Sequence, residues 1–253
     1  MVTIIAVNNQ KGGVAKTTTC LSLGACLAEM GYTVLLIDLD PQAHLTLSLG
    51  LKPERLHRTV TDALLTNASL LSVSRESAIF NMDIVPANQK LALIDKLLYG
   101  QKGYEFRLKR RLGAIQEGFY DVILIDCPPS FNTLTLNALT AANLLVIPVQ
   151  CEYYAAQSLS GIIELAKLVQ TRTNPHLTYQ MVVTMYDRRN RICQFIFERL
   201  QRELNQILCQ TIIEIDTKLR ESPVFGQPIT HYAPETRGAQ QYRALAKELM
   251  NHG

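Results

Sequence analysis

Two lysines and a pair of glycines stand close together near the N-terminus, within residues 8–19, which read NNQKGGVAKTTT. Adjacent glycines let backbone N–H groups approach phosphate oxygens, and a Lys-Thr pair after them supplies a cation and a hydroxyl ligand for Mg²⁺. Lys16 and Thr17 provide that pair. The usual pattern G-x-x-x-x-G-K-[ST] is not met, because Gln10 and Ala15 occupy its glycine positions. The segment, called the phosphate loop below, predicts phosphate chemistry in an unusual form of the motif.

The phosphate loop stands between a short apolar run, residues 3–7, and a helix-like segment, residues 17–30. Strand, loop and helix in this order are the context in which such a motif binds phosphate, because the positive end of the helix faces the anion. A plain turn followed by a capped helix with two solvated lysines is the alternative. The flanking strand and Thr17 favour phosphate binding.

Aspartates end two further apolar runs. Asp38 and Asp40 stand in VLLIDLDP, and Asp126 ends VILID before a Cys-Pro-Pro sequence. The carboxyl ends of parallel strands meet at one edge of a sheet, where carboxylates can hold Mg²⁺-bound water or orient an attacking water. Each segment alone would also suit a structural turn at a strand end. Their order after the phosphate loop favours a role in the same site.

Short, β-branched apolar runs alternate with longer amphipathic stretches along the chain. The continuous hydrophobicity of the runs indicates strands covered on both faces, and the alternation predicts an α/β fold with one doubly wound, mostly parallel sheet flanked by helices. With no repeat or Pro/Gly-rich linker, we expect a single domain over residues 1–253. The predicted strands are 3–7, 33–38, 83–86, 122–126, 144–148, 179–185 and 211–215. The predicted helices are 17–30, 91–97, 106–117, 134–142, 158–170, 193–208 and 238–250.

The composition is that of an ordinary soluble globular protein, with 47% apolar and 19% charged residues. A formal charge of +3 permits nucleic-acid contact without requiring it. No signal-peptide pattern begins the chain, and no apolar run approaches the about 18 residues that span a bilayer. The six cysteines are scattered, which predicts buried, reduced thiols in a cytosolic protein.

The segment KGGVAKTT resembles the deviant Walker A loop, K-G-G-x-x-K-[ST], of the ParA/MinD family of ATPases, a class of P-loop NTPase, and the aspartate motifs follow in the family's order. The resemblance covers essentially the whole chain. It implies ATP and Mg²⁺ as cofactors and a homodimer that closes over two nucleotides. Lys11 would reach the phosphates bound by the other subunit, much as an arginine finger does. The implied nucleotide-binding residues of the loop are Lys11, Gly12, Gly13, Val14, Ala15, Lys16, Thr17 and Thr18.

The same resemblance implies roles for residues outside the loop. Asp40 would orient the attacking water, so that the catalytic set is Lys11, Lys16 and Asp40. Thr17, Asp40 and Asp126 would bind the metal directly or through its water. At the ends of late strands, Met185 would pack on the adenine and Asp216 would hydrogen-bond it.

The chain departs from the family's pattern at Ala15 and at Glu214. Ala15 stands where glycine is usual, and we expect a negative φ there, at which alanine costs little. Glu214 stands where proline is often found, which leaves the details of base packing open. Cys127, within the Cys-Pro-Pro sequence, invites comparison with iron–sulfur relatives, but we expect it to be structural.

The C-terminal segment TKLRESPVFGQP resembles the ending of ParA/Soj-type members, which bind double-stranded DNA non-specifically. The position of the DNA-contacting arginine falls on Lys218, and lysine still neutralises phosphate as a point charge. A second basic run, RLKRR at residues 107–111, is explained better by solvation than by a binding role. The predicted DNA-binding residues are Lys218, Arg220, Arg237 and Arg243.

These features predict a cytoplasmic, nucleoid-associated ATPase that is slow until a ParB-like activator stimulates it. A nucleotide-gated DNA-binding switch with negligible hydrolysis is one alternative. A MinD-like membrane-associated ATPase is another, but the chain ends without a basic amphipathic extension, so we expect no membrane partner. The cargo, whether plasmid, chromosome or protein assembly, stays open.

Overall fold

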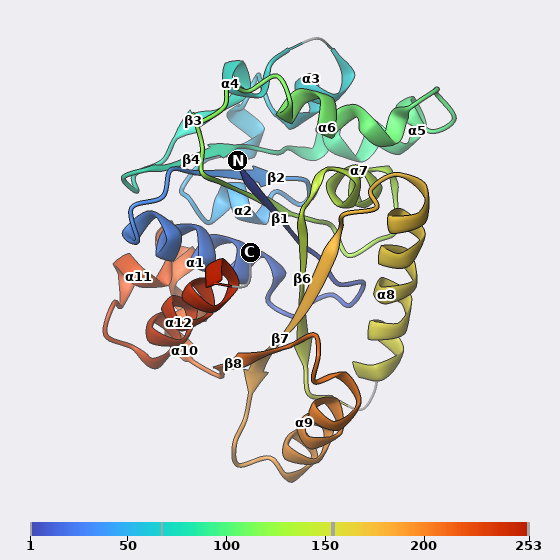
Figure 1. Cartoon of the computed structure of the whole chain (residues 1–253). Coiled ribbons are helices and arrows are strands. Elements are labelled where there is room, and N and C mark those ends of the chain that lie inside the picture. The colour runs from blue at the N-terminus through green and yellow to red at the C-terminus, as the bar shows by residue number, and fades with distance from the viewer. Residues whose placement is uncertain (1, 67, 153–154, 252–253) are drawn as a thin grey trace.

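The computed structural model describes residues 2–66, 68–152 and 155–251, and an eight-stranded sheet forms its centre (Figure 1). The strand order is β3-β4-β2-β5-β1-β6-β7-β8, and neighbours are parallel except for β3 and β4. This confirms the predicted fold class. The strands are β1 Thr3–Val7, β2 Val34–Asp38, β3 Arg75–Glu76, β4 Met82–Val85, β5 Val122–Asp126, β6 Leu144–Gln150, β7 Thr178–Tyr186 and β8 Leu208–Glu214.

Helices cover both faces of the sheet, because successive residues of each strand point to opposite sides. In β2, Val34 and Leu36 join the apolar cluster beneath α1 and α12, while Leu35 and Ile37 join the cluster beneath α3, α7 and α8. The α-helices are α1 Lys16–Glu29, α2 His44–Leu47, α3 Val60–Leu65, α4 Leu70–Val73, α5 Ile94–Leu98, α6 Arg107–Leu112, α7 Thr133–Ala141, α8 Ala155–Arg172, α9 Arg191–Leu204, α10 Thr217–Glu221, α11 Ile229–Tyr232 and α12 Arg237–Asn251.

The predicted elements differ from the observed ones mainly at their ends. Helix α9 ends at Leu204 instead of continuing to Leu208, because Leu208 begins β8 and pairs with Met181 of β7. Helix α6 ends at Leu112, and Gly113 forms its C-cap. The predicted end, Glu117, lies five residues further along the chain. The short elements β3, α2, α3, α4, α10 and α11 were not predicted.

The C-terminal helix packs against the helix that follows the phosphate loop. Tyr242, Leu245 and Leu249 of α12 are buried in the cluster shared with α1. The Tyr242 hydroxyl lies 3.0 Å from Thr19 Oγ1 in the first turn of α1. The apolar face of α12 is thus part of the core, as the sequence predicts. In the described part of the chain, no helix is both long enough and apolar enough to cross a membrane.

Gly24 lets α1 approach the sheet closely. A methyl group at this position would lie 2.7 Å from Leu36 Cδ2 and 3.2 Å from Met82 Sδ. We expect Gly24→Ala to lower the free energy of unfolding by about 1–3 kcal/mol, because the packed core must shift to admit it. Urea denaturation followed by circular dichroism measures the change. The matched control is Gly113→Ala, at a helix end with φ −65° and no atom nearer than 3.5 Å, which should be neutral.

Candidate nucleotide-binding site

The phosphate loop turns from the end of β1 into the first turn of α1. Gly13 has φ +77°, a conformation that glycine adopts without strain, and nothing occupies the space beside Gly12 or Gly13. Lys16 Nζ donates to Lys11 O at 3.1 Å, so the ammonium group is held across the loop. Burial lowers the pKa of Lys16, while the nearby Asp126 and Asp40 act in the opposite direction. The loop therefore presents a desolvated cation beside open backbone.

Thr17 and Asp126 meet beneath the loop. Thr17 Oγ1 donates to Asp126 Oδ2 at 2.7 Å. The other carboxylate oxygen, Asp126 Oδ1, is buried and has no hydrogen-bond partner. Buried polar atoms nearly always have a partner, so an orphaned carboxylate oxygen beside a threonine hydroxyl fits a hydrated divalent cation. These residues are therefore compatible with Mg²⁺.

Asp38 adds a second buried carboxylate, since it is the register partner of Asp126 across β2 and β5. It accepts hydrogen bonds from Thr46 N at 2.9 Å and Thr46 Oγ1 at 2.7 Å, and from Asp40 N at 3.0 Å. Burial, partly offset by these bonds, raises the pKa of Asp38 to about 6. Burial and the charge of Asp38 likewise raise the pKa of Asp126. Two desolvated carboxyl groups thus lie side by side at this edge of the sheet, and burial disfavours the charged form of each.

Asp40 lies on the turn that follows β2, at the same edge of the sheet. Its Oδ1 accepts a hydrogen bond from Gln42 N at 2.9 Å, which fixes the turn after Pro41. The two aspartates of the DLDP motif therefore lie in different environments. Asp38 anchors the turn from within the core, and Asp40 is half-buried near Lys16.

Lys11 pairs with a residue that the sequence did not indicate. Its ammonium group forms an ion pair with Glu152, just beyond the end of β6, and its backbone N–H donates to Asn9 Oδ1 at 3.0 Å. Lys11 remains 28% exposed, whereas Lys16 is only 8% exposed. The two lysines of the motif thus occupy different environments. Glu152 carries no local sequence signal, because its partner lies 141 residues away.

A narrow pocket adjoins the loop at the ends of β7 and β8, and it contains Met185 and Asp216. Thr184 Oγ1 donates to Val14 O at 3.1 Å, which ties β7 to the loop. Both carboxylate oxygens of Asp216 accept backbone N–H groups, from Lys218 at the start of α10 and Gly238 at the start of α12, each at 2.9 Å. The lining residues are Ala15, Thr18, Thr184, Met185, Ile213, Glu214, Ile215, Asp216, Leu219, Arg220 and Tyr242.

Ala15 corrects one expectation, since its φ is +64° and not negative. It lies in the left-handed region as the N-cap of α1, where its carbonyl accepts Thr19 N at 2.8 Å. Ala43, after Asp40, and Met185 also have positive φ. Strained backbone of this kind clusters at functional sites, where the surrounding structure holds it in place. Three of the four such non-glycine residues in the described chain surround this site.

We expect Ala15→Gly to stabilise the protein by about 0.5–1 kcal/mol, because alanine carries a left-handed penalty that glycine avoids. The gain in melting temperature should be about 2–4 °C per kcal/mol for a chain of this length. Differential scanning calorimetry without nucleotide measures it. Ala25→Gly, in the interior of α1, is the control and should destabilise by about 1 kcal/mol or more. A melting temperature lowered by both substitutions would contradict the strain at Ala15.

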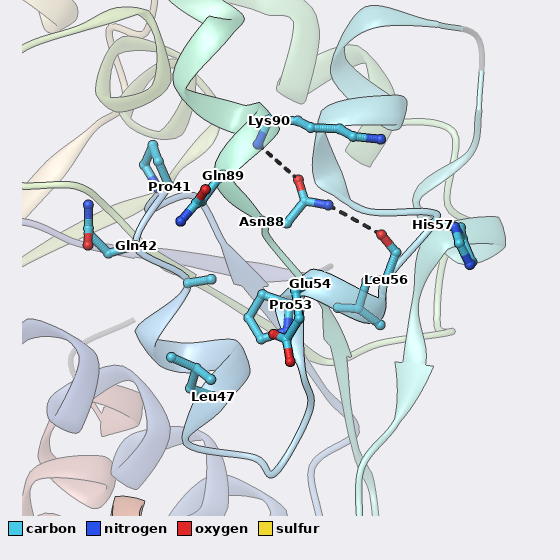
Figure 2. Close-up of a pocket in the computed structure, with 11 residues that line it drawn as sticks. Pro41, Gln42, Leu47, Pro53, Glu54, Leu56, His57, Asn88, Gln89 and Lys90 are labelled. Atoms are coloured by element: carbon cyan, nitrogen blue, oxygen red, sulfur yellow. Dashed lines mark hydrogen bonds between the residues drawn. The ribbon is translucent and has the colours of Figure 1, made fainter.

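A wider hollow of about 480 Å³ lies beside the turn that carries Asp40 (Figure 2). Asn88 spans its wall, accepting from Lys90 N at 3.2 Å and donating to Leu56 O at 3.3 Å. The turn at Pro41 therefore borders open space on this side. The residues lining the hollow are Pro41, Gln42, Ala43, Leu47, Pro53, Glu54, Leu56, His57, Asn88, Gln89 and Lys90.

Three of the four predicted DNA-binding side chains have acidic partners. Lys218 Nζ lies 2.7 Å from Glu221 Oε2 and 5.7 Å from the centre of the Tyr232 ring. Arg243 pairs with Glu29 at 2.8 Å. Arg237 pairs with Glu214 at 2.7 Å. Arg220 differs, since it lines the narrow pocket.

Glu214 ties three segments together, which its sequence position alone did not reveal. It ends β8 and is only 4% exposed. Its two carboxylate oxygens pair with Arg188, after β7, and with Arg237, the first residue of α12. Gln241 Oε1 accepts the Glu214 backbone N–H at 2.9 Å. A charged residue directly after the apolar pair Ile212 and Ile213 was the available signal in the sequence.

The three arginines of the run at residues 107–111 have structural roles. Arg107 donates to Leu64 O at 3.2 Å, Arg110 to Gly103 O at 3.2 Å and Arg111 to Ala63 O at 2.9 Å. These bonds connect α6 to the end of α3 and to the turn before α6. They explain the cluster without a ligand.

All six cysteines are free and buried, as the sequence predicts. Burial holds the pKa of the Cys127 thiol well above its usual value, with a smaller effect of Asp126 in the same direction. A buried, protonated thiol fits the structural role expected for Cys127.

Comparisons with known proteins agree with this geometry. The model of the AAA domain family AAA_31 matches residues 2–179. The chain is 42% identical to the sporulation initiation inhibitor protein Soj of Bacillus subtilis over 251 residues, 99% of each protein. It is 36% identical to the chromosome partitioning protein ParA of Caulobacter vibrioides over 250 residues, 98% of this chain and 94% of that protein.

A solved structure of a protein with a different name shares the fold. The cobyrinic acid a,c-diamide synthase of Mycobacterium smegmatis, with a bound ATP analogue and magnesium, superposes with a TM-score of 0.88 at 36% identity. The alignment covers 100% of this chain and 96% of that one. With its two-lysine phosphate loop and its parallel sheet, the chain belongs to the ParA/MinD family of P-loop ATPases.

Proposed function

We propose that this protein is a ParA-type partition ATPase that binds ATP with Mg²⁺, dimerises over the nucleotides and holds double-stranded DNA non-specifically. Hydrolysis is slow until a ParB-like partner stimulates it, and release from DNA moves or positions the cargo. The observation that carries the proposal is the phosphate loop with two lysines above the Thr17–Asp126 pair and its orphaned carboxylate oxygen. Residues 1–253 act as one ATPase domain in the cytoplasm, on the nucleoid.

Within one subunit, the loop residues 11–18 bind the phosphates through backbone N–H groups and through Lys16. Thr17, by its hydroxyl, and the carboxylates of Asp126 and Asp40 would hold the metal. Bound Mg²⁺ would neutralise charge on the phosphate oxygens. Asp40 orients the attacking water from the turn after β2. Met185 and Asp216 form part of the pocket that receives the adenine.

Lys11 acts across the dimer. Its ion pair with Glu152 is partly exposed, so exchanging that partner for a phosphate of the facing subunit carries a small penalty. A cation supplied in trans then stabilises the charge that develops on the transferred phosphoryl group. The site would be complete only in the dimer, so we expect slow turnover by the isolated protein.

DNA binding uses the basic surface of α10 and α12, with Lys218 as its centre. Arg237 and Arg243 add positive charge, although each also has an acidic partner. Point-charge contacts to phosphate give binding that depends on salt and not on sequence.

An electrophoretic mobility shift on non-specific duplex DNA tests the proposal. We expect a shift with ATP, none with ADP, and a loss of the shift in Lys218→Glu. Lys102→Glu is the charge-matched control and should bind as the unmodified protein does. Lys102 lies shortly before α6, which packs in the apolar cluster on the opposite face of the sheet from α12. Absence of a shift with every nucleotide would remove DNA from the proposal and leave the ATPase attached to another matrix.

A nucleotide-gated DNA-binding switch with negligible hydrolysis is the second candidate, favoured by the strained Ala15 in the loop. Phosphate release at saturating ATP and DNA separates the two functions. Turnover stimulated by DNA and a ParB-like protein supports the partition ATPase. Nucleotide-dependent DNA binding with no phosphate release supports the switch.

A further inference from the structure

Arg220 stands apart from the other basic residues of the C-terminal surface. Lys218, Arg237 and Arg243 each have an acidic partner, whereas Arg220 forms no ion pair with any described residue. Its three acidic neighbours, Glu214, Asp216 and Glu221, are already engaged. Both carboxylate oxygens of Asp216 accept backbone N–H groups. Glu221 Oε2 accepts from Lys218 and from the Tyr232 hydroxyl, and Glu214 holds Arg188 and Arg237. An exposed guanidinium group is therefore available to a ligand.

Helix α10 directs its two cations to different places. The helix is fixed at its start by the Asp216 cap and from below by the buried Leu219. Residues two apart on a helix do not face each other. Lys218 accordingly lies over Tyr232 on the outer surface, while Arg220 lines the pocket that also contains Met185 and Asp216.

The pocket adjoins the phosphate loop directly, because Ala15 and Thr18 belong to both. A nucleotide whose phosphates occupy the loop would therefore place its base here, at the carboxyl ends of the parallel strands. Several walls are apolar, including Met185, Ile213 and Leu219. In such surroundings the planar, weakly hydrated guanidinium of arginine stacks well on an aromatic ring.

We propose that Arg220 is a base-contacting residue of the nucleotide site, with its guanidinium group stacked on the purine ring, and is not part of the DNA surface. The inference rests on the proposed function, since it requires a nucleotide on the phosphate loop. In this proposal, two residues of α10 bind different ligands: Lys218 contacts DNA and Arg220 contacts the nucleotide.

Isothermal titration calorimetry of the full chain with Mg-ADP and with Mg-pyrophosphate tests the proposal, because pyrophosphate occupies the loop without a base. We expect Arg220→Ala to weaken ADP binding by about threefold to tenfold and to leave pyrophosphate binding unchanged. Arg220→Lys keeps the charge without the plane and should fall between. Arg202→Ala, an equal loss of charge on α9, is the control and should bind both ligands normally.

Each other outcome overturns a distinct statement. Equal weakening of ADP and pyrophosphate would place Arg220 on the phosphates and not on the base. Unchanged ADP binding combined with loss of the DNA mobility shift would return Arg220 to the DNA surface. Failure of the unmodified protein to bind ADP would overturn the proposed function itself, and the inference with it.

Discussion

Lys11→Ala should retain bound nucleotide and lose turnover. The phosphates of its own subunit are held by the loop backbone and by Lys16, so affinity for ADP should change by less than about threefold. A cation supplied in trans to a phosphoryl-transfer site is worth about 10³-fold or more in rate. DNA-stimulated release of labelled phosphate should therefore fall to the limit of detection.

Glu152→Gln is the matched variant, because it removes the partner of Lys11 and leaves the lysine. It should keep full turnover or exceed it, since Lys11 no longer has to leave an ion pair. Size-exclusion chromatography with ATP adds the oligomeric state, and Lys11→Ala should shift it toward the monomer. Persistent turnover in Lys11→Ala would contradict the proposed role of Lys11 at the phosphates of the facing subunit, whatever the effect on assembly.

Asp126→Asn should separate stability from function. Burial and the charge of Asp38 raise the pKa of Asp126, so the ionised carboxylate destabilises the folded chain without nucleotide. Asparagine has nearly the same shape and no charge. We expect the variant without ligand to be more stable near pH 7 than the unmodified protein. Affinity for Mg-ATP should fall by about 10–100-fold, as for residues that hold metal-bound water.

The stability gain of Asp126→Asn should depend on pH in a direction that follows from the raised pKa of Asp126. A raised carboxyl pKa means that the folded chain binds a proton that the unfolded chain has released, so the deficit of the unmodified protein appears as pH rises above about 4. The stability gain of Asp126→Asn should therefore vanish toward low pH. Asp121 gives the opposite control, because hydrogen bonds from Thr33 lower its pKa. Asp121→Asn should destabilise near neutral pH, and this loss should disappear on acidification.

The fold was predictable because its strands are buried on both faces. In β1 and β5 an unbroken apolar run ends at a polar residue, and the predicted ends match the observed ones. Between α9 and β8, Leu204 and Leu208 fit the spacing of a helix, although Leu208 belongs to the strand. The predicted end of α9 was therefore wrong. Short elements such as α10 carry too few residues for a periodic signal.

The site was predictable where residues cluster in sequence, as in the phosphate loop. It was not predictable where distant segments meet. Glu152 and Glu214 acquire their significance from lysine and arginine partners that the chain brings together only on folding. The φ of Ala15 was also missed, because alanine normally signals a negative φ and the surrounding loop overrides that preference.

The carboxylate of Glu214 has an evolutionary consequence. Two arginines, Arg188 and Arg237, share this single anion, and neither has another acidic partner among the described residues. A relative with proline at position 214 has no charge there to hold them. Replacing Glu214 by proline would therefore leave Arg188 and Arg237 without this acidic partner, so we expect a substitution at any one of the three positions to change the constraint on the other two.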